Sequence, residues 1–199
     1  MTPLDESVTG VILAGGRSSR FGTNKALSIF RGERLIERLV RSLRSVTGEL
    51  MIITNSPDEY AFLDLPMVSD LIKDCGPLAG IYTALKTATT PLSLCTACDM
   101  PFAQPAFMRY LVTRASEADV VTPVSKQGDE PLCAVYRDTC VPLIETRLQA
   151  GQYKITGFYE HARVNRIYPQ DTPAYDSWSL FNVNTREEYT EALKHLEEG

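Results

Sequence analysis

The stretch VILAGGRSSRFGTNKAL, residues 11–27, constrains the fold most strongly, because an apolar run passes directly into glycines and basic residues. The run itself, Val8–Ala14, has the length and composition of a strand that is buried on both faces. Comparable runs recur along the chain and alternate with segments of helical periodicity, such as Glu33–Val46. Strands that alternate with helices indicate βαβ units. We therefore expect a single-domain α/β fold of three layers, a mostly parallel mixed sheet with helices on both faces.

The same reasoning predicts the approximate bounds of the remaining elements. Further strands are expected at 49–54, 65–70, 92–99, 118–124, 131–136 and 162–168. Helices are expected at 76–88, with Pro77 in the first turn, and at 104–116, 138–150, 153–160 and 185–196. The last helix is expected to be capped by Thr185 and to carry acidic residues in its first turn.

The charge of the chain is unevenly distributed. The net charge of −5, from 20 Lys and Arg against 25 Asp and Glu, disfavours broad nucleic-acid binding. Residues 17–44, however, contain eight basic and two acidic residues, which gives this segment a local charge of +6. This asymmetry favours a small anionic ligand near the N-terminal segment. Four of the eight are expected to form only a solvated helix face: Arg34, Arg38, Arg41 and Arg44.

Several features predict a cytoplasmic protein without a membrane partner. No apolar run approaches the roughly 20 residues needed to cross a bilayer, and the first ten residues lack the features of a signal peptide. The five cysteines, an odd number, favour free thiols over a disulfide framework. Cys95 and Cys98 form a C-x-x-C, but they fall in a predicted strand, where residues three apart point to opposite faces. We therefore expect structural thiols there and no zinc or redox site.

The loop after the first strand has the composition of a phosphate-binding site. Gly15 and Gly16 carry no Cβ atoms, so backbone N–H groups there can approach a phosphate closely. Arg17, Arg20 and Lys25 can neutralise phosphate charge, arginine through a planar fork and lysine as a compact point charge. The loop is not a Walker A motif, because two residues separate its last glycine from the lysine. An ordinary turn with solvated arginines is the alternative that the loop alone leaves open.

Polar residues also follow the other strands, at the edge where parallel sheets bind ligands. They are Asn55, Asp70 and Asp99 after the second, third and fourth strands, and Asn182 and Asn184 in the late segment FNVNT. Each one alone is also typical of a turn. Asp99 could hold Mg²⁺, because a single carboxylate with water and phosphate oxygens is a common magnesium site. The joint occurrence of these residues favours a binding site over five unrelated turns.

The segment GPLAG introduces the helix expected at 76–88. Gly76 and Gly80 would let a flat ligand lie against backbone, and the start of the helix offers free N–H groups. A glycine-containing helix entry without a ligand has the same composition, so the segment alone does not decide between them.

Five segments together resemble the molybdenum cofactor guanylyltransferase family: LAGGRSSRFGTNKAL, GPLAG, CDMPF, EPLCAVY and FNVNTREEY, in this order between Val8 and Tyr189. That family belongs to the nucleotidyltransferases with a Rossmann-like fold that also make nucleotide sugars. The first segment is shared by several relatives, whereas GPLAG with FNVNT is more particular to the molybdenum branch. The resemblance implies one nucleotidyltransferase domain over residues 1–199, with a nucleotide-binding part at about 8–125 and an acceptor-binding part at about 126–199.

Together with the loop chemistry, the resemblance implies a set of site residues. The expected GTP-binding set is Leu13, Ala14, Gly15, Gly16, Arg17, Lys25, Asn55, Asp70, Gly76, Gly80 and Asp99. The expected catalytic set is Arg20, Lys25 and Asp99, with Asp99 as the magnesium ligand, and the acceptor side is expected to use Asn182 and Asn184. The chain departs from the family at Asn24, where an acidic residue is frequent. The loop before Gly76 is also short, which leaves the choice between Asp70 and Asp74 open.

The function implied by the resemblance is magnesium-dependent transfer of GMP from GTP to the terminal phosphate of molybdopterin, with release of pyrophosphate. Other cofactor-biosynthesis proteins and molybdoenzyme chaperones are further expected partners. A related enzyme that uses CTP on molybdopterin, or a nucleotide on a sugar phosphate, remains an alternative because spacing does not determine the base. A non-catalytic nucleotide-binding regulator is a second alternative, although it would need neither Lys25 nor Asp99. An NAD-dependent oxidoreductase is disfavoured, because the chain lacks G-x-G-x-x-G and has Asn55 in place of an acidic residue.

Overall fold

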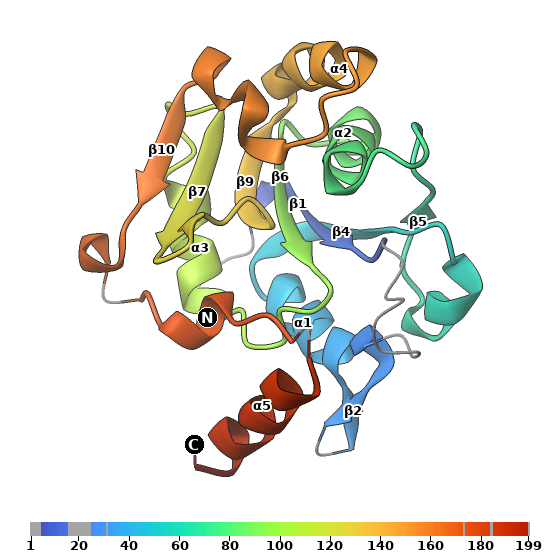
Figure 1. Cartoon of the computed structure of the whole chain (residues 1–199), viewed down its shortest axis with the longest axis vertical. Coiled ribbons are helices and arrows are strands. Elements are labelled where there is room, and N and C mark those ends of the chain that lie inside the picture. The colour runs from blue at the N-terminus through green and yellow to red at the C-terminus, as the bar shows by residue number, and fades with distance from the viewer. Residues whose placement is uncertain (1–4, 16–24, 31, 173, 184, 199) are drawn as a thin grey trace.

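The computed structural model describes residues 5–15, 25–30, 32–172, 174–183 and 185–198 of the chain. These residues form three layers, in which a central mixed sheet has helices packed on both faces (Figure 1). The α/β architecture predicted from the alternation of strands and helices is therefore confirmed. None of the described helices is long and apolar enough to cross a bilayer.

The central sheet joins its strands in the order β10–β7–β9–β6–β1–β4–β5, with β8 paired to β7. The bounds are β1 Asp5–Leu13, β4 Thr47–Ile53, β5 Met67–Val68, β6 Leu92–Ala97, β7 Val120–Ser125, β8 Gly128–Asp129, β9 Cys133–Arg137 and β10 Val164–Ile167. β1 is parallel to β4 and β6, β4 to β5, and β10 to β7, whereas β9 is antiparallel to β6 and β7. All strands of this order except β9 therefore point the same way, and their carboxyl ends share one edge.

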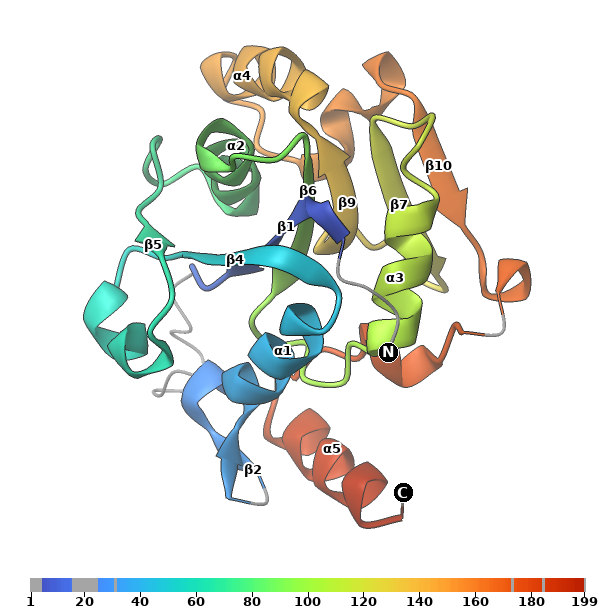
Figure 2. The same cartoon turned by 180° about the vertical axis from the view of Figure 1, so that it is seen from behind.

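Two pairs of helices cover the sheet, one pair on each face (Figures 1 and 2). α1 (Leu35–Arg44) and α3 (Pro105–Thr113) pack on one face, and α2 (Pro77–Thr87) and α4 (Val141–Gln149) pack on the other. The central strand β1 contributes to both cores, because Val8 and Ile12 join the first while Val11 and Leu13 join the second. This two-sided burial explains why the strand reads as an apolar run instead of alternating with polar residues.

The C-terminal helix α5 (Arg186–Glu198) lies outside these layers (Figure 1). It packs through Ala192 against a small apolar cluster with Leu35, Phe102 and Val183. Its start follows the prediction, because the Thr185 hydroxyl accepts the Glu188 N–H at 3.1 Å and the Glu188 carboxylate accepts the Thr185 N–H at 2.7 Å. This reciprocal pair is a capping box.

The start of α1 differs from the prediction. Glu33 and Arg34 were expected in the helix, but they form strand β3 (Glu33–Arg34), paired antiparallel with β2 (Ile29–Phe30). Gly32 has a φ of 81°, a conformation that glycine adopts readily and that lets the chain reverse between the two strands. α1 then begins after the extended Arg34, whose N–H donates to the Glu37 carboxylate at 2.7 Å.

Several connecting segments are 3₁₀-helices: η1 Lys25–Leu27, η2 Pro57–Leu63, η3 Asp138–Cys140, η4 Ile155–His161, η5 Pro169–Asp171 and η6 Ser177–Leu180. The helix expected at 153–160 is thus a 3₁₀-helix that begins two residues later. Gly157 lies in its middle, where a Cβ atom would come within 2.5 Å of Arg147 Nη2. The Arg147 side chain of α4 thus lies directly against Gly157, and glycine is also a weak former of α-helix.

The described cysteines are free thiols, as expected. Cys95 is fully buried in the core under α2 and α4, whereas Cys98 packs against the core under α1 and α3. The C-x-x-C therefore places its two sulfur atoms on opposite faces of the sheet, which confirms the structural interpretation.

The four arginines in and just before α1 are half-buried or exposed, and three of them lie close to acidic residues. Arg38 and Arg41 approach Glu33 at 3.7 and 2.5 Å, and Arg34 approaches Glu37 at 3.9 Å. These contacts support the interpretation of a solvated helix face.

Candidate active site

The carboxyl edge of the sheet brings together the ends of four neighbouring strands, β6, β1, β4 and β5 (Figure 1). In the register of the sheet, Leu13 of β1 lies beside Ala97 of β6 and Ile53 of β4. Ile53 in turn lies beside Val68 of β5. The segments that follow these four residues therefore leave the sheet next to one another, at the edge where parallel sheets bind ligands.

Backbone hydrogen bonds extend this alignment past the strand ends. The Ala14 N–H donates to the Ile53 carbonyl at 2.9 Å, and the Cys98 N–H donates to the Leu13 carbonyl at 3.2 Å. Gly15, the next residue, is exposed at the top of the edge. The backbone of Leu13, Ala14 and Gly15 is thus held between the ends of β4 and β6, with its last residue accessible to a ligand.

Asn55 and Asp70 bind each other directly beside this backbone. The Asn55 Nδ2–H donates to Asp70 Oδ2 at 2.8 Å, and the Asp70 N–H donates to Asn55 Oδ1 at 3.1 Å. A Cβ atom added at Gly15 would lie 4.0 Å from Asp70 Oδ2, and one added at Gly80 would lie 3.7 Å from Asp70 Oδ1. Four of the sequence-predicted residues therefore meet at one place, although they come from four different segments.

Helix α2 begins next to this group. Gly76 precedes it with a φ of 66°, a backbone conformation that favours glycine, and Pro77 occupies the first turn as predicted. Asp74, the alternative to Asp70, is exposed and has a φ of 60°. The contacts with Asn55 and the proximity to Gly15 favour Asp70 over Asp74 as the carboxylate of this site.

Asp99 lies at the end of β6 and links the site to the late segment FNVNT. Its side chain is half-buried, and its backbone carbonyl accepts the Val183 N–H at 2.9 Å. Asn182, immediately before Val183, is also half-buried, and its Nδ2–H donates to the Leu180 carbonyl at 3.4 Å. The backbones that carry Asp99 and Asn182 are therefore adjacent.

Other predicted site residues fall outside the described part of the chain. These are Gly16, Arg17, Arg20 and Asn184. Lys25 is described only as the first residue of η1. The roles assigned to these residues in holding phosphate or acceptor remain predictions.

Two threonines shape the site but were not recognised in the sequence. Thr54 is buried, and its hydroxyl accepts the Ser56 N–H at 3.1 Å, which fixes the turn that presents Asn55. Thr83 is buried in α2, and its hydroxyl accepts the Leu71 N–H at 2.9 Å. A polar residue directly after a strand is a recognisable signal for Thr54, whereas no local pattern distinguishes Thr83.

The donor set at this edge is compatible with one kind of metal site. Within the described ranges, no group of three or more His, Cys, Asp or Glu side chains could hold a metal ion by itself. Asp99 offers a single carboxylate at a strand end, which matches the way Mg²⁺ is bound with water and substrate phosphates. The residues present therefore fit a magnesium ion that arrives with a nucleotide.

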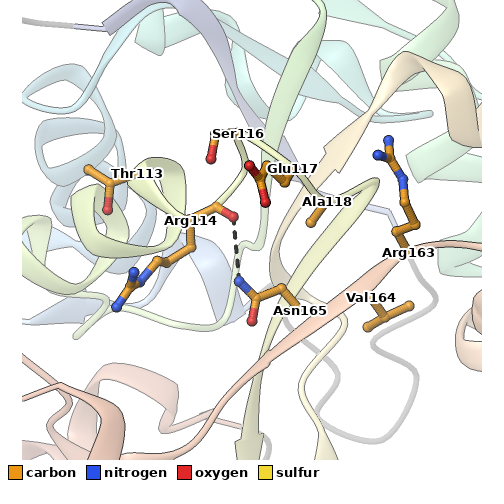
Figure 3. Close-up of a pocket in the computed structure, with 8 residues that line it drawn as sticks. All are labelled: Thr113, Arg114, Ser116, Glu117, Ala118, Arg163, Val164 and Asn165. Carbon is orange, nitrogen blue, oxygen red and sulfur yellow. Dashed lines mark hydrogen bonds between the residues drawn. The ribbon is translucent and has the colours of Figure 1, made fainter.

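A cavity of about 450 Å³ lies at the opposite edge of the sheet, at the amino ends of β7 and β10 (Figure 3). Arg114, Glu117, Arg163 and Asn165 contribute to its wall, and Asn165 Nδ2–H donates to the Arg114 carbonyl at 3.5 Å. The cavity shares no residue with the predicted nucleotide site. It therefore does not alter the assignment of the site to the carboxyl edge.

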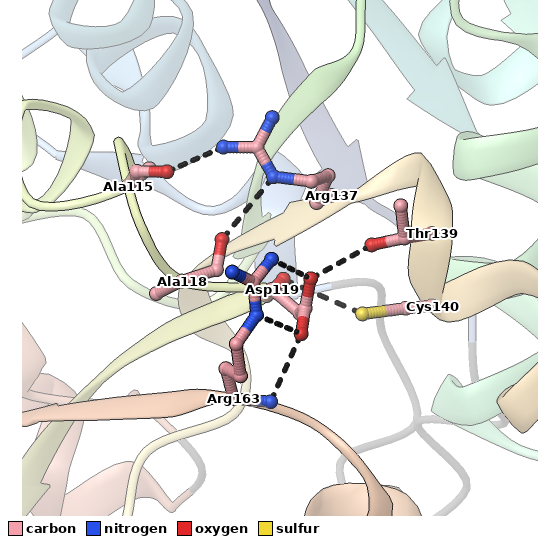
Figure 4. A network of polar contacts seen from close by, with 7 residues as sticks. All are labelled: Ala115, Ala118, Asp119, Arg137, Thr139, Cys140 and Arg163. Atoms are coloured by element: carbon pink, nitrogen blue, oxygen red, sulfur yellow. Dashed lines mark hydrogen bonds and ion pairs between the residues drawn. The ribbon is translucent and has the colours of Figure 1, made fainter.

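Arg163, one of the two arginines in the wall of this cavity, belongs to a network of hydrogen bonds (Figure 4). The Asp119 carboxylate accepts the N–H, Nε–H and Nη2–H of Arg163 at 3.0, 3.0 and 2.9 Å, and the Thr139 hydroxyl at 3.0 Å. The hydrogen bonds from Arg163 hold the pKa of Asp119 well below its usual range. The charge of Arg163 is thus already balanced by a protein carboxylate.

Comparison with known proteins gives consistent matches over most of the chain. A family model described as a MobA-like NTP transferase domain matches residues 10–164. The chain is 39% identical over 191 residues to the "probable molybdenum cofactor guanylyltransferase" of Carboxydothermus hydrogenoformans, covering 95% of this chain and 96% of the relative. It is 36% identical over 198 residues to the molybdenum cofactor guanylyltransferase of Desulfosudis oleivorans, with 98% of each chain covered.

A solved structure also shares the fold. Molybdopterin-guanine dinucleotide biosynthesis protein A from Archaeoglobus fulgidus superposes with a TM-score of 0.82, over 96% of this chain and 100% of that one. The two sequences are 24% identical, so this likeness supports the architecture.

Proposed function

Because the chain belongs to the MobA-like NTP transferase domain family, we propose that it transfers GMP from GTP to the terminal phosphate of molybdopterin, giving molybdopterin guanine dinucleotide and pyrophosphate. The two relatives described above are named a probable molybdenum cofactor guanylyltransferase and a molybdenum cofactor guanylyltransferase, and these names support the choice of donor and acceptor. The chain is accordingly a nucleotidyltransferase.

One structural observation carries the proposal. The Leu13–Gly15 backbone, the Asn55–Asp70 pair and the Asp99 loop lie at adjacent strand ends. A nucleotide bound at this edge could contact the exposed backbone at Gly15 and the carboxylates of Asp70 and Asp99. Separate strands supply these groups, so the sheet holds them at fixed spacing without requiring a ligand.

The reaction needs positioning more than proton transfer. An oxygen of the acceptor phosphate attacks the α-phosphorus of GTP, a new P–O bond forms, and the bond between the α-phosphorus and the bridging oxygen breaks as pyrophosphate leaves. The attacking oxygen is already anionic, so no strong general base is required. Arg17, Arg20 and Lys25, which follow the first strand in sequence, would hold the triphosphate and stabilise the leaving pyrophosphate.

We assign Asp99 as the residue that would hold Mg²⁺. The ion, when bound, would neutralise charge on the phosphate oxygens. The contribution of the chain is to hold the Asp99 loop in place, through the bonds of Cys98 to Leu13 and of Val183 to the Asp99 carbonyl. These two bonds fix the loop from both sides of the site.

We further propose that the nucleotide binds to the part of the chain at about 8–125 and the acceptor to the part at about 126–199. Asn182 and Asn184 would serve the acceptor side. The hydrogen bond from the Val183 N–H to the Asp99 carbonyl supports an acceptor close to the metal, because it joins the late segment to the residue assigned to the metal. Cofactor-biosynthesis proteins and molybdoenzyme chaperones are the proposed protein partners.

The proposal is tested by measuring pyrophosphate release from the purified protein with GTP, CTP or UTP, with and without molybdopterin, and with Mg²⁺ or EDTA. We expect release only with GTP, molybdopterin and Mg²⁺ together. Release with CTP alone, or with glucose 1-phosphate in place of molybdopterin, would assign the chain to a related transferase. Nucleotide binding without release under any condition would instead indicate a regulator.

A further inference from the structure

Thr83, on the buried side of α2, contacts the segment that carries Asp70. Its side chain is completely buried. The hydroxyl donates to the Ala79 carbonyl at 2.8 Å and accepts the Leu71 N–H at 2.9 Å. A helix residue is thus bonded to a loop residue twelve positions earlier in the chain.

The direction of these two hydrogen bonds is fixed by chemistry. A backbone N–H can only donate and a carbonyl can only accept, so the single hydroxyl proton of Thr83 must point to Ala79 and its lone pair to Leu71. The loop bond therefore depends on an acceptor atom in the side chain at position 83. An apolar side chain of the same shape would fill the space but leave the Leu71 N–H without this partner.

The Leu71 N–H belongs to the peptide group that immediately follows Asp70. The peptide group before Asp70 is held as well, because its N–H donates to Asn55 Oδ1 at 3.1 Å. Asp70 is therefore held on both sides along the backbone, by Asn55 from the segment that follows β4 and by Thr83 from α2. Gly80, about one helical turn before Thr83, lies next to the Asp70 carboxylate, since a Cβ added there would lie 3.7 Å from Oδ1.

We propose that Thr83 is a positioning residue for the nucleotide site, which sets the orientation of Asp70 through the peptide group of Leu71. The proposal rests on the function proposed above. Thr83 touches neither substrate nor metal in this account, because it lies beneath the loop. Thr83 therefore affects the affinity of the preformed site for the nucleotide, and not the rate of the transfer step.

The test compares three variants of the full chain with the wild type. Thr83→Val keeps the shape but removes the hydroxyl, and Thr83→Ser restores the hydroxyl. Thr87→Val is the matched control, because the Thr87 hydroxyl donates to the Thr83 carbonyl at 2.8 Å one turn further along the same helix. The measurements are kcat and KM for the nucleotide, its dissociation constant by calorimetry, and the melting temperature.

We expect Thr83→Val to raise KM and the dissociation constant for GTP about tenfold while kcat changes by less than about threefold. Thr83→Ser and Thr87→Val should stay within about twofold of the wild type in both quantities. If Thr83→Val melts below the assay temperature, Thr83→Ala takes its place and should show the same rise in KM.

Unchanged nucleotide affinity in a folded Thr83→Val or Thr83→Ala would overturn the proposal, as would an equal loss in Thr87→Val. A loss that Thr83→Ser does not restore would also overturn it. Failure of the proposed function gives a different result, because the wild type would then not turn over GTP. In that case the same variants are titrated with whichever nucleotide the wild type turns over or binds.

Discussion

Replacement of Asn55 by aspartate tests whether the Asn55–Asp70 pair lies in the nucleotide site. The substitution keeps the size of the side chain but exchanges an N–H donor 2.8 Å from Asp70 Oδ2 for a carboxylate oxygen. One hydrogen bond is lost, which costs about 0.5–1.5 kcal/mol. Two like charges about 4 Å apart add a repulsion of about 1 kcal/mol at an exposed position such as this one. The combined effect of about 2 kcal/mol would move Asp70 away from its present position.

Steady-state kinetics with saturating molybdopterin measures the consequence. We expect Asn55→Asp to raise KM for GTP about 10- to 30-fold, which corresponds to about 1.4–2 kcal/mol of lost binding. The kcat should change by less than about threefold, because Asp99 lies on a different strand end and is untouched. Asn55→Ala removes both hydrogen bonds between the Asn55 side chain and Asp70 without adding charge, and it should also raise KM for GTP.

Asn165→Asp serves as the control for charge alone, since Asn165 lies at the opposite edge of the sheet beside the cavity of Figure 3. It should leave KM for GTP within about twofold of the wild type. An unchanged KM for GTP in Asn55→Asp would show that the Asn55–Asp70 pair lies outside the nucleotide site, and an equal increase in Asn165→Asp would show that the effect is not specific to this pair.

Three further predictions concern the metal, the fold and the thiols. Asp99→Ala should keep its circular dichroism spectrum but lose at least about a hundredfold in kcat, and near-normal turnover would remove the metal assignment. Because Arg163 lowers the pKa of Asp119, the charged carboxylate stabilises the fold above the unfolded pKa near 3.9. Asp119→Asn should thus lower the free energy of unfolding by about 1 kcal/mol at neutral pH, a small value because Arg163 is mostly exposed. This difference between variant and wild type should disappear as the pH falls through the folded pKa of Asp119, and a difference that persists in acid would contradict the prediction. Burial raises the pKa of the Cys133 and Cys140 thiols to about 12. Mass spectrometry should therefore find neither thiol alkylated by iodoacetamide before the protein unfolds, and rapid alkylation of the folded protein would argue against their burial.

The elements that the sequence predicts well are those with a strong local pattern. Val8–Ala14 shows the continuous apolar run of a strand covered on both faces, and the structure places this strand inside the sheet, between β6 and β4. Pro77 and Thr185 mark the starts of α2 and α5, because proline and threonine each satisfy a local requirement of a helix N-terminus. In each case the deciding interactions lie within a few residues of one another.

The predictions that failed or were incomplete depend on contacts between distant segments. Glu33 and Arg34 follow helical periodicity, but pairing with β2 holds them as a strand. The segment around Gly157 is a 3₁₀-helix, and it lies against the Arg147 side chain of α4. Local periodicity carries no information about either neighbour.

The candidate site shows the same division. Asn55, Asp70 and Asp99 are recognisable as polar residues after strands, but their mutual arrangement follows from the strand order β6–β1–β4–β5. Thr83 could not be found in this way, because it appears in the sequence as one more small residue inside a helix. Its role follows only from the bond to Leu71 across the β5–α2 connection.

The most direct test of the proposed transfer follows the phosphorus atoms of GTP. Purified protein is incubated with molybdopterin, Mg²⁺ and GTP that is radiolabelled at either the α- or the γ-phosphate, and the products are separated by chromatography. We expect the α-label to appear in a molybdopterin dinucleotide and the γ-label in pyrophosphate. Transfer of the γ-label to molybdopterin, or release of the γ-label as inorganic phosphate without a dinucleotide, would contradict guanylyl transfer.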